Sequence, residues 1–283
     1  MYGVDPSREG SQDYYDSIVE LYAEWGVDFI KADDMSNPYH AGEIELLNNA
    51  IDTCGRDIVL SLSPGPTPID NAEHVKTHAN MWRLSGDVWD KWRDVCTGFE
   101  LAERWNAHRE QGHWPDLDML PFGRLELLAA EDGVGHGRER WTRLTRNEQF
   151  TMITLWIIFR SPLMIGANLP DNDAWTLSLL TNDETLAIAK NSHSNRQLYR
   201  GEDRAAWAAS GTDGSHYLAL FNLGPKGVPI EATFEQIGLK GRYSLRDLWL
   251  RRDLGEADSV VAAKVPSHGA KLFRLTPVDR KGG

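Results

Sequence analysis

The chain has 283 residues, 41% of them hydrophobic, which is enough for a sizeable core in one large domain or two smaller ones. It carries 30 lysine and arginine residues against 42 aspartate and glutamate residues, a formal charge of -12, so a nucleic-acid backbone or an anionic membrane surface would be repelled. The longest apolar run, Met152–Phe159 with one threonine, is far shorter than the roughly 20 residues of a membrane span.

Cysteine usage excludes one further class, and the N-terminal segment shows no secretion signal. Cys54 and Cys96 allow at most one disulfide and lack a metal-binding spacing, so a disulfide-stapled miniprotein is excluded. The first residues are polar and turn-rich, without the basic and then apolar pattern of a secretion signal. The compartment is therefore left unassigned.

The first 190 residues alternate between helical and strand patterns. Apolar residues recur at helical spacing from Tyr14 to Trp25, Gly26 follows as a stop signal, and Val27–Ala32 then has the pattern of a short buried strand. Helices are also expected at 43–54, 71–78, 88–107 and 147–160, each followed by an expected strand, at Ile58–Ser63, Ala79–Leu84, His113–Leu120 and Pro162–Gly166. Strands that alternate with helices predict a parallel sheet with right-handed crossovers, and a barrel is the architecture we expect.

Beyond about Lys190 the pattern changes to short alternating runs without helices. Strands are expected at 197–199, 205–209, 216–222, 228–233, 243–247, 260–265 and 270–275, separated by glycine-rich turns. This spacing predicts an antiparallel β-sandwich. We therefore expect a barrel domain at 1–190 and a sandwich domain at 191–283, with the hinge at 191–195.

The expected strands are too few for a complete barrel. A (β/α)8 barrel takes about 250 residues and eight strands, whereas five strands are expected in the first 190 residues. The predicted fold is therefore α/β, a (β/α)8 TIM barrel of which only about strands 4 to 8 are present, followed by the antiparallel β-sandwich.

Charged residues stand at the ends of two predicted strands. Lys31 and Asp33 point to the same side of the first strand, where a carboxylate beside a cation can stay ionised and act as a nucleophile. The alternative is a helix-capping pair, Asp33 and Asp34, with a solvated lysine. Arg83 and, after a turn of small residues, Asp87 follow a second strand. Retaining glycoside hydrolysis needs two such carboxylates, which we expect in one pocket with oxygens about 5 to 7 Å apart.

Other constellations are weaker. Trp114, Asp116 and Asp118 suit a sugar platform with polar orienting groups, or the two aspartates simply tie the loop down through backbone hydrogen bonds. A metal site formed by the aspartates with His113 is a weaker interpretation. A zinc site on the i, i+4 pair His74 and His78 is also possible, but two histidines on the protein surface are the favoured interpretation. The sequence contains no GxSxG, P-loop or GxGxxG motif.

Four separated blocks carry a family resemblance. In chain order they are WGVDFIKADD (Trp25–Asp34), WRLSGDVWDKW (Trp82–Trp92), GHWPDLDML (Gly112–Leu120) and LWIIFRSPLMIG (Leu155–Gly166). They resemble the blocks of glycoside hydrolase family 27, the α-galactosidases, which also carry a C-terminal β-sandwich. The resemblance covers nearly the whole chain.

The resemblance implies residue roles. Asp33 corresponds to the nucleophile, Lys31 to a contact with sugar hydroxyls, Arg83 to a substrate ligand, Asp87 to the acid/base and Met119 to a residue lining the sugar pocket. Such enzymes release α-galactose with retention by double displacement. The resemblance thus implies an α-galactoside oligosaccharide or glycan as substrate, with no metal and no cofactor. Family members are often secreted or periplasmic.

Three features differ from the family pattern. Met35 stands where the family has a cysteine, so that disulfide is absent. Leu62–Pro66 replaces a Cys-acidic/polar-Trp stretch, and the small Ser63, expected at the sugar's 2-position, leaves room for an acetamido group or for another loop. The three opening βα units, with a tryptophan and paired aspartates for the 4- and 6-hydroxyls, have no counterpart here. The alternatives are therefore an α-N-acetylgalactosaminidase, a β-L-arabinopyranosidase or a non-catalytic sugar-binding fragment.

Overall fold

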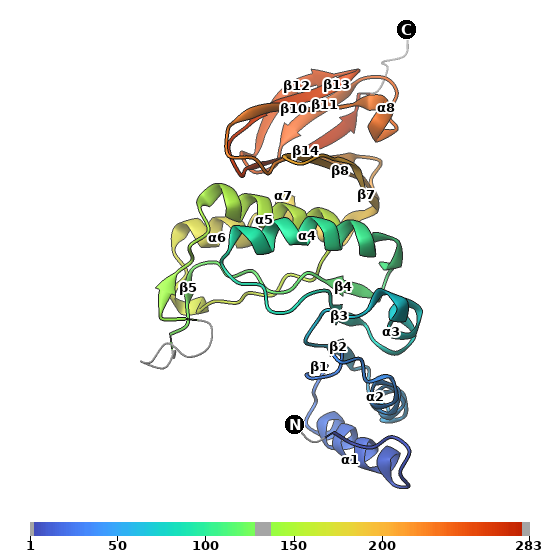
Figure 1. Cartoon of the computed structure of the whole chain (residues 1–283). Helices are drawn as coiled ribbons and strands as arrows, with labels where there is room; N and C mark the ends of the chain where they lie inside the picture. Colours follow the sequence, from blue (N-terminus) through green and yellow to red (C-terminus); the bar gives the residue numbers. More distant parts are fainter. Residues whose placement is uncertain (1–2, 128–136, 279–283) are drawn as a thin grey trace. The chain divides into compact units, whose positions relative to one another are not determined.

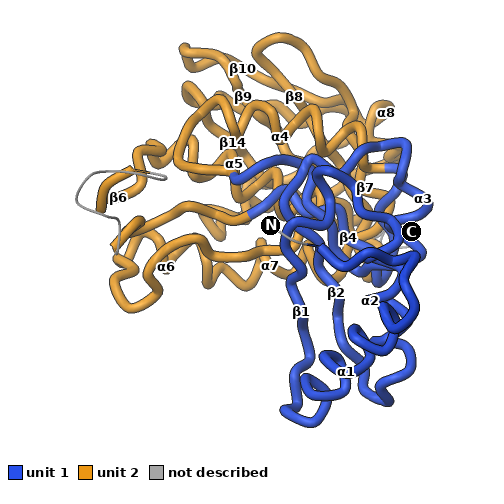
Figure 2. Tube along the Cα trace, turned by 60° about the horizontal axis from the view of Figure 1, so that its bottom comes forward, with its two compact units in different colours: residues 1–87, 107–118 blue, residues 88–106, 119–283 orange. Residues whose placement is uncertain are grey.

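The chain divides into two compact units. The computed structural model describes residues 3–127 and 137–278, and Figure 1 labels most of their helices and strands. Unit 1 comprises residues 1–87 and 107–118, and unit 2 comprises residues 88–106 and 119–283 (Figure 2). These units are not the two domains expected from the sequence, whose division at residue 190 stays a prediction.

Unit 1 contains a parallel sheet. Its four strands pair in the order β1-β2-β3-β4, every pair parallel. The strands are β1 (Phe29–Ala32), β2 (Val59–Leu62), β3 (Met81–Arg83) and β4 (Trp114–Asp116). The helical elements are α1 (Ser11–Glu24), α2 (Ala41–Thr53), η1 (Ile69–Asn71) and α3 (Ala72–His78). The alternation of helices with parallel strands predicted from the sequence is confirmed, although each strand is shorter than expected.

Local sequence explains where these helices stop and which strands are buried. Gly26 and Gly55, two residues beyond the ends of α1 and α2, have left-handed φ angles of 75° and 77°, which glycine adopts without steric cost. Leu60 and Leu62 of β2 and Trp82 of β3 are at most 1% exposed. The core of unit 1 therefore lies on the two central strands.

The predicted strand His113–Leu120 is interrupted. Asp118 has a φ of 82°, a left-handed conformation that ends the extended backbone after β4. Leu120, the last residue of the predicted strand, makes an isolated parallel bridge with Ile165. The expected strand Pro162–Gly166 is reduced to that bridge, so the prediction of five strands was wrong for the described residues.

Unit 2 contains one helix that is buried over most of its length, α5 (Arg146–Phe159), and several others. The others are α4 (Trp92–Trp105), η2 (Asn106–His108, whose first residue alone belongs to unit 2), η3 (Leu169–Asp171), α6 (Ala174–Leu180) and α7 (Asp183–Asn191). Strand β5 (Arg124–Leu125) pairs antiparallel with β6 (Arg140–Trp141). A capping box between Thr145 and Glu148 starts α5, whose residues Thr151–Phe159 are all buried. Helix α5 contacts α4, α7 and four strands of the C-terminal sheet.

The C-terminal strands form the predicted antiparallel β-sandwich. One sheet has six strands in the order β12-β11-β14-β9-β8-β7, and β10 pairs with β13. The strands are β7 (Ser192–Arg200), β8 (Arg204–Gly211), β9 (His216–Asn222), β10 (Val228–Thr233), β11 (Tyr243–Asp247), β12 (Arg252–Ala257), β13 (Val260–Val265) and β14 (Ala270–Pro277), with α8 at Phe234–Ile237. The sequence pattern missed β12, whose residues are mostly exposed.

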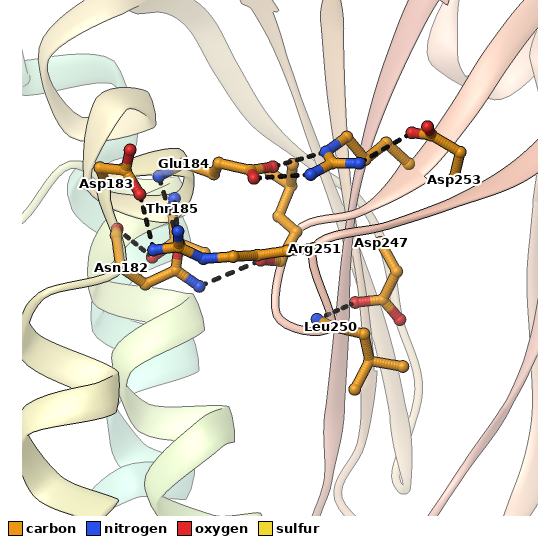
Figure 3. A network of polar contacts seen from close by, with 10 residues as sticks. Asn182, Asp183, Glu184, Thr185, Asp247, Leu250, Arg251 and Asp253 are labelled. Atoms are coloured by element: carbon orange, nitrogen blue, oxygen red, sulfur yellow. Dashed lines mark hydrogen bonds and ion pairs between the residues drawn. The ribbon is translucent and has the colours of Figure 1, made fainter. Parts of the chain in front are cut away.

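A polar network joins α7 to the sandwich (Figure 3). Arg246 on β11 donates two hydrogen bonds of 2.7 Å to the carboxylate of Glu184 and one of 2.9 Å to Asp253. Asn182 caps α7 and donates to the carbonyl oxygen of Leu248 at 3.0 Å. These contacts explain why α7 and the sandwich belong to one compact unit although their sequence patterns differ.

Two expectations about composition can be compared with the structure. Cys54 and Cys96 are both free thiols. Within residues 3–127 and 137–278, every helix is too short or too polar to cross a membrane.

Candidate active site

The end of β1 is bonded to the end of β2 through Ser63. The pairing places Ala32 beside Leu62, and the Ser63 amide donates to the Ala32 carbonyl oxygen at 3.0 Å. The Ser63 hydroxyl donates a hydrogen bond of 2.8 Å to Oδ1 of Asp33. Ser63 is 3% exposed, whereas Asp33 is exposed. A buried hydroxyl therefore orients a carboxylate that solvent or a substrate can reach.

Ser63 also fixes the loop that follows Asp33. The Met35 amide donates to the Ser63 carbonyl oxygen at 2.9 Å. Asp34, which lies between Asp33 and Met35 in the sequence, has a φ of 63°. This left-handed turn brings the chain back to Ser63, so Asp33 is held from both sides.

The end of β3 carries a buried arginine that holds two carboxylates. Arg83 is 2% exposed, and its Nη2 lies 2.8 Å from Oδ2 of Asp118 and 3.2 Å from Oδ1 of Asp87. The same nitrogen donates to the Ser85 carbonyl oxygen at 3.3 Å. The Asp118 side chain is 6% exposed and that of Asp87 46% exposed. Asp118 thus neutralises the guanidinium inside the fold, while Asp87 is presented outward.

The end of β4 supplies a buried carboxyl group. Asp116 lies beside Arg83 in the β3-β4 pair, and its Oδ1 accepts a hydrogen bond of 2.8 Å from the Asp118 amide. Burial raises the pKa of Asp116 from 3.8 to about 6. The Asp118 carboxylate adds to this rise, whereas the hydrogen bond from the Asp118 amide and the charges of Arg83 and Lys31 oppose it.

The two predicted catalytic carboxylates follow strands that are separated by one strand. Asp33 follows β1 and Asp87 follows β3, with β2 between them. Strands in a sheet are about 4.8 Å apart, so these strand ends lie roughly 10 Å apart. Two aspartate side chains directed toward each other across that gap can approach the separation that retaining enzymes use. Their actual separation stays a prediction.

Lys31 and Met119 are the other predicted substrate contacts. Lys31 lies on β1, is exposed and acts electrostatically on Asp116. Met119 belongs to unit 2, where it packs on Gly166; a Cβ added to Gly166 would lie 2.3 Å from the Met119 sulfur. The proposed contact of Met119 with the sugar stays a prediction.

The histidines considered as metal ligands have other contacts. His74 Nδ1 lies 2.7 Å from the Tyr39 hydroxyl, and its Nε2 lies 3.0 Å from a Glu45 oxygen. His113 precedes β4 and contacts the Ala79 carbonyl oxygen at 3.1 Å, at the opposite end of the strand from Asp116. In the part of the chain that the structure describes, no three metal-ligating side chains gather in one place.

Sequence reasoning missed how these strand ends are tied together. It named Asp116 and Asp118 only as sugar-orienting or loop-tying groups, and the structure shows that Asp116 ties the loop while Asp118 pairs with Arg83. The Asp-x-Asp spacing at a strand end is the only sequence signal for this. Nothing in the sequence indicates that Tyr39, in the loop after Asp33, bonds to His74 of α3.

Comparison with known families identifies the fold. Residues 6–191 match the model for "Alpha galactosidase A", and residues 201–275 match that for the "Alpha galactosidase C-terminal beta sandwich domain". The chain belongs to the α-galactosidase family, glycoside hydrolase family 27. Its fold is that of the family, a TIM-barrel domain plus a C-terminal β-sandwich, although the sheets in the described residues are not closed.

Curated relatives are longer than this chain. Alpha-galactosidase 2 of Arabidopsis thaliana is 26% identical over 273 residues, which is 94% of this chain and 64% of that protein. The α-galactosidase of rice, Oryza sativa subsp. japonica, is 26% identical over 277 residues, 95% of this chain and 61% of the relative. The chain therefore spans less than two thirds of the length of these relatives.

Two solved structures are more similar in sequence. The β-L-arabinopyranosidase of Geobacillus stearothermophilus is 45% identical with a TM-score of 0.95, over 100% of this chain and 65% of that one. A Bacillus halodurans protein described as a candidate α-N-acetylgalactosaminidase is also 45% identical, with a TM-score of 0.85, over 99% of this chain and 65% of that one. The fold is thus shared with proteins named for three different sugars.

Proposed function

We propose that the chain carries the catalytic carboxylates of a retaining glycosidase that acts on terminal α-D-galactosyl residues. The observation that carries this proposal is the pair of accessible carboxylates that follow β1 and β3 of one parallel sheet, Asp33 held by Ser63 and Asp87 held by Arg83. Membership of the α-galactosidase family supports the sugar class.

In the proposed reaction the two carboxylates divide the work. Asp33 attacks the anomeric carbon while Asp87 donates a proton to the departing glycosidic oxygen, giving an ester between Asp33 and the sugar. Asp87 then takes a proton from water, the water oxygen attacks the anomeric carbon, and Asp33 is released. Two inversions at one carbon give overall retention. Lys31 and Arg83 are the proposed contacts to sugar hydroxyls.

A β-L-arabinopyranosidase activity is the second candidate. One of the two structures at 45% identity belongs to such an enzyme, an aspartate-to-alanine variant of which has been solved in complex with arabinose. The curated α-galactosidases described above are 26% identical. β-L-Arabinopyranose has the ring configuration of α-D-galactopyranose without the C6 hydroxymethyl group. The same two carboxylates can therefore serve either sugar, and groups around C6 decide between them.

The small side chain at position 63 supports a third candidate, an α-N-acetylgalactosaminidase activity. The side chain of Ser63 is small, and the candidate α-N-acetylgalactosaminidase of Bacillus halodurans is as similar in sequence as the arabinopyranosidase. Ser63 is engaged by Asp33, however, so a 2-acetamido group would have to fit beside an existing hydrogen bond. We place this activity third.

We further propose that β1 to β4 form part of an eight-stranded barrel, corresponding to strands 4 to 7. Strand β1 pairs on one side only in the described residues, and Phe29 on it is 39% exposed. An unpaired edge with exposed apolar side chains is costly for a parallel sheet, which is normally covered on both faces. We therefore expect amide hydrogens of β1 to exchange much faster than those of β9 in the 283-residue chain.

The function is tested by hydrolysis of 2,4-dinitrophenyl α-D-galactopyranoside, its 2-acetamido derivative and the β-L-arabinopyranoside. Both the 283-residue chain and a hybrid in which these residues replace the matching part of the Geobacillus enzyme are measured. We expect the longer form to hydrolyse the galactoside or the arabinoside with retention, at least tenfold faster than the chain alone. Sugar binding without hydrolysis in both forms would contradict the proposal and favour a non-catalytic module.

A further inference from the structure

Asp118, which pairs with Arg83, is itself bonded to Asp116 at the end of β4. Asp116 Oδ1 accepts the Asp118 amide at 2.8 Å, and Asp118 Oδ2 lies 2.8 Å from Arg83 Nη2. Arg83 Nη2 in turn lies 3.2 Å from the Asp87 carboxylate. A continuous chain of polar contacts thus runs from a buried carboxyl group to the accessible Asp87.

The bond from Asp116 lies where the backbone is strained. Asp118 has a φ of 82°, and an aspartate in the left-handed region needs support from its surroundings. Asp116 supplies that support because its side chain bonds the amide two residues ahead, as in an Asx turn. The Leu84 amide donates to the Asp116 carbonyl oxygen at 3.0 Å, which fixes Asp116 to β3.

We propose that Asp116 is a positioning residue: by bonding the Asp118 amide it sets the turn that presents Asp118 to Arg83, and through Arg83 it orients the acid/base Asp87. Asp116 is 4% exposed and acts through the two neighbouring residues, so it need not touch substrate. This role rests on the proposed glycosidase function, in which Asp87 is the acid/base.

The charge of Asp116 determines how firmly it holds the turn. An ionised carboxylate accepts a stronger hydrogen bond than a protonated one. Three charged groups act on it: Asp118 in the following turn, Arg83 on β3 and Lys31 on β1. Since burial brings the pKa of Asp116 to about 6, the turn should be held more weakly as the pH falls through that value.

Two substitutions separate the hydrogen bond from the charge. Asp116→Asn keeps an acceptor oxygen but remains neutral at every pH, and Asp116→Leu removes the acceptor while keeping the branched shape and the number of side-chain heavy atoms. Asp70→Asn, which removes one charge from an exposed position in the same unit, is the matched control. At pH 7.5 we expect kcat to fall about tenfold in the Asn variant and about 100-fold in the Leu variant, with KM changed less than about twofold.

The experiment uses two independent measurements on the 283-residue chain, NMR spectroscopy and enzyme kinetics. NMR follows the Asp118 amide and the Nε–H of the buried Arg83 between pH 4 and 8. Hydrolysis of unactivated phenyl glycosides, whose leaving group needs protonation by the proposed acid Asp87, gives the pH profile of kcat. We expect both signals and kcat to change with a midpoint near pH 6 in the wild-type chain and in Asp70→Asn, and this midpoint to disappear in Asp116→Asn.

The outcomes distinguish this inference from the proposed function. If the chain hydrolyses none of the glycosides, the proposed function fails in this form, and the two NMR signals alone decide whether Asp116 controls Asp118 and Arg83. Signals that do not respond to pH or to Asp116→Asn overturn the inference. A pH profile in Asp116→Asn identical to that of the wild type also overturns it, even if kcat is lower, because a purely structural defect would give that result.

Discussion

The hydroxyl of Ser63 donates a hydrogen bond of 2.8 Å to Oδ1 of Asp33, joining the ends of β2 and β1. The bond leaves Oδ2 of Asp33 for attack on a sugar and restricts rotation of the carboxylate. It also explains why a small hydroxyl residue suits position 63, a relation that the sequence alone did not indicate.

Removal of this hydroxyl should slow catalysis without unfolding the chain. In Ser63→Ala, Asp33 stays exposed to water but loses its orienting donor, and we expect kcat to fall about tenfold. Ser61→Ala, on the strand β2 that Ser63 follows, is the matched control and should keep kcat within about twofold. Steady-state kinetics on a dinitrophenyl glycoside checks this. Equal losses in the two variants would mean that the hydroxyl of Ser63 has no special role.

Substitutions at the two carboxylates should differ in their dependence on the leaving group. Asp33→Asn should abolish formation of the glycosyl-enzyme with every substrate, because the nucleophile is lost. Asp87→Asn should lose about 100- to 10,000-fold on unactivated glycosides but much less on dinitrophenyl glycosides, whose leaving group needs little protonation. Pre-steady-state release of dinitrophenol measures this step. If both variants lost the same factor on both kinds of substrate, the assignment of roles would be wrong.

The buried pair of Arg83 and Asp118 should matter for stability more than the exposed contact with Asp87. Asp118→Ala leaves the guanidinium of Arg83, 2% exposed, without its closest buried carboxylate, and we expect a loss of about 3 kcal/mol in the free energy of unfolding. Asp87→Ala, at a side chain 46% exposed, should cost less than about 1 kcal/mol. Urea denaturation followed at β3 amide signals compares the two. Similar losses would show that Arg83 does not depend on Asp118.

Asp116 should reduce stability at neutral pH. Its pKa rises on folding from 3.8 to about 6, so the folded chain binds this proton more tightly than the unfolded chain does. The resulting contribution to stability is fully present below pH 3.8 and is lost as the pH rises through about 6. The loss amounts to about 3 kcal/mol above that range.

The neutral variant Asp116→Asn should escape this loss. We therefore expect Asp116→Asn to be more stable than the wild type at pH 8, and the difference to shrink toward pH 4. Urea denaturation at several pH values checks this. A variant that is less stable than the wild type at pH 8 would contradict the buried, ionised state of Asp116.

Local patterns in the sequence predicted most elements of the fold, and contacts between distant segments explain what they missed. Helical spacing and glycine stop signals located α1 and α2, and strand-end charges located Asp33 and Asp87. The break at Asp118 was missed because no glycine or asparagine marks that left-handed position. The pairing of Arg83 with Asp118 depends on β3 lying beside β4, which only the folded sheet establishes.

The assignment of Asp33 as nucleophile is the central claim, and covalent trapping tests it most directly. A fluorinated galactosyl or arabinopyranosyl fluoride that slows the second step is incubated with the active form, and the labelled peptide is sequenced by mass spectrometry. We expect one sugar per chain, attached to Asp33, and no label in Asp33→Asn. A label on the adjacent Asp34 or on Asp87, or continued hydrolysis by Asp33→Asn, would contradict the account.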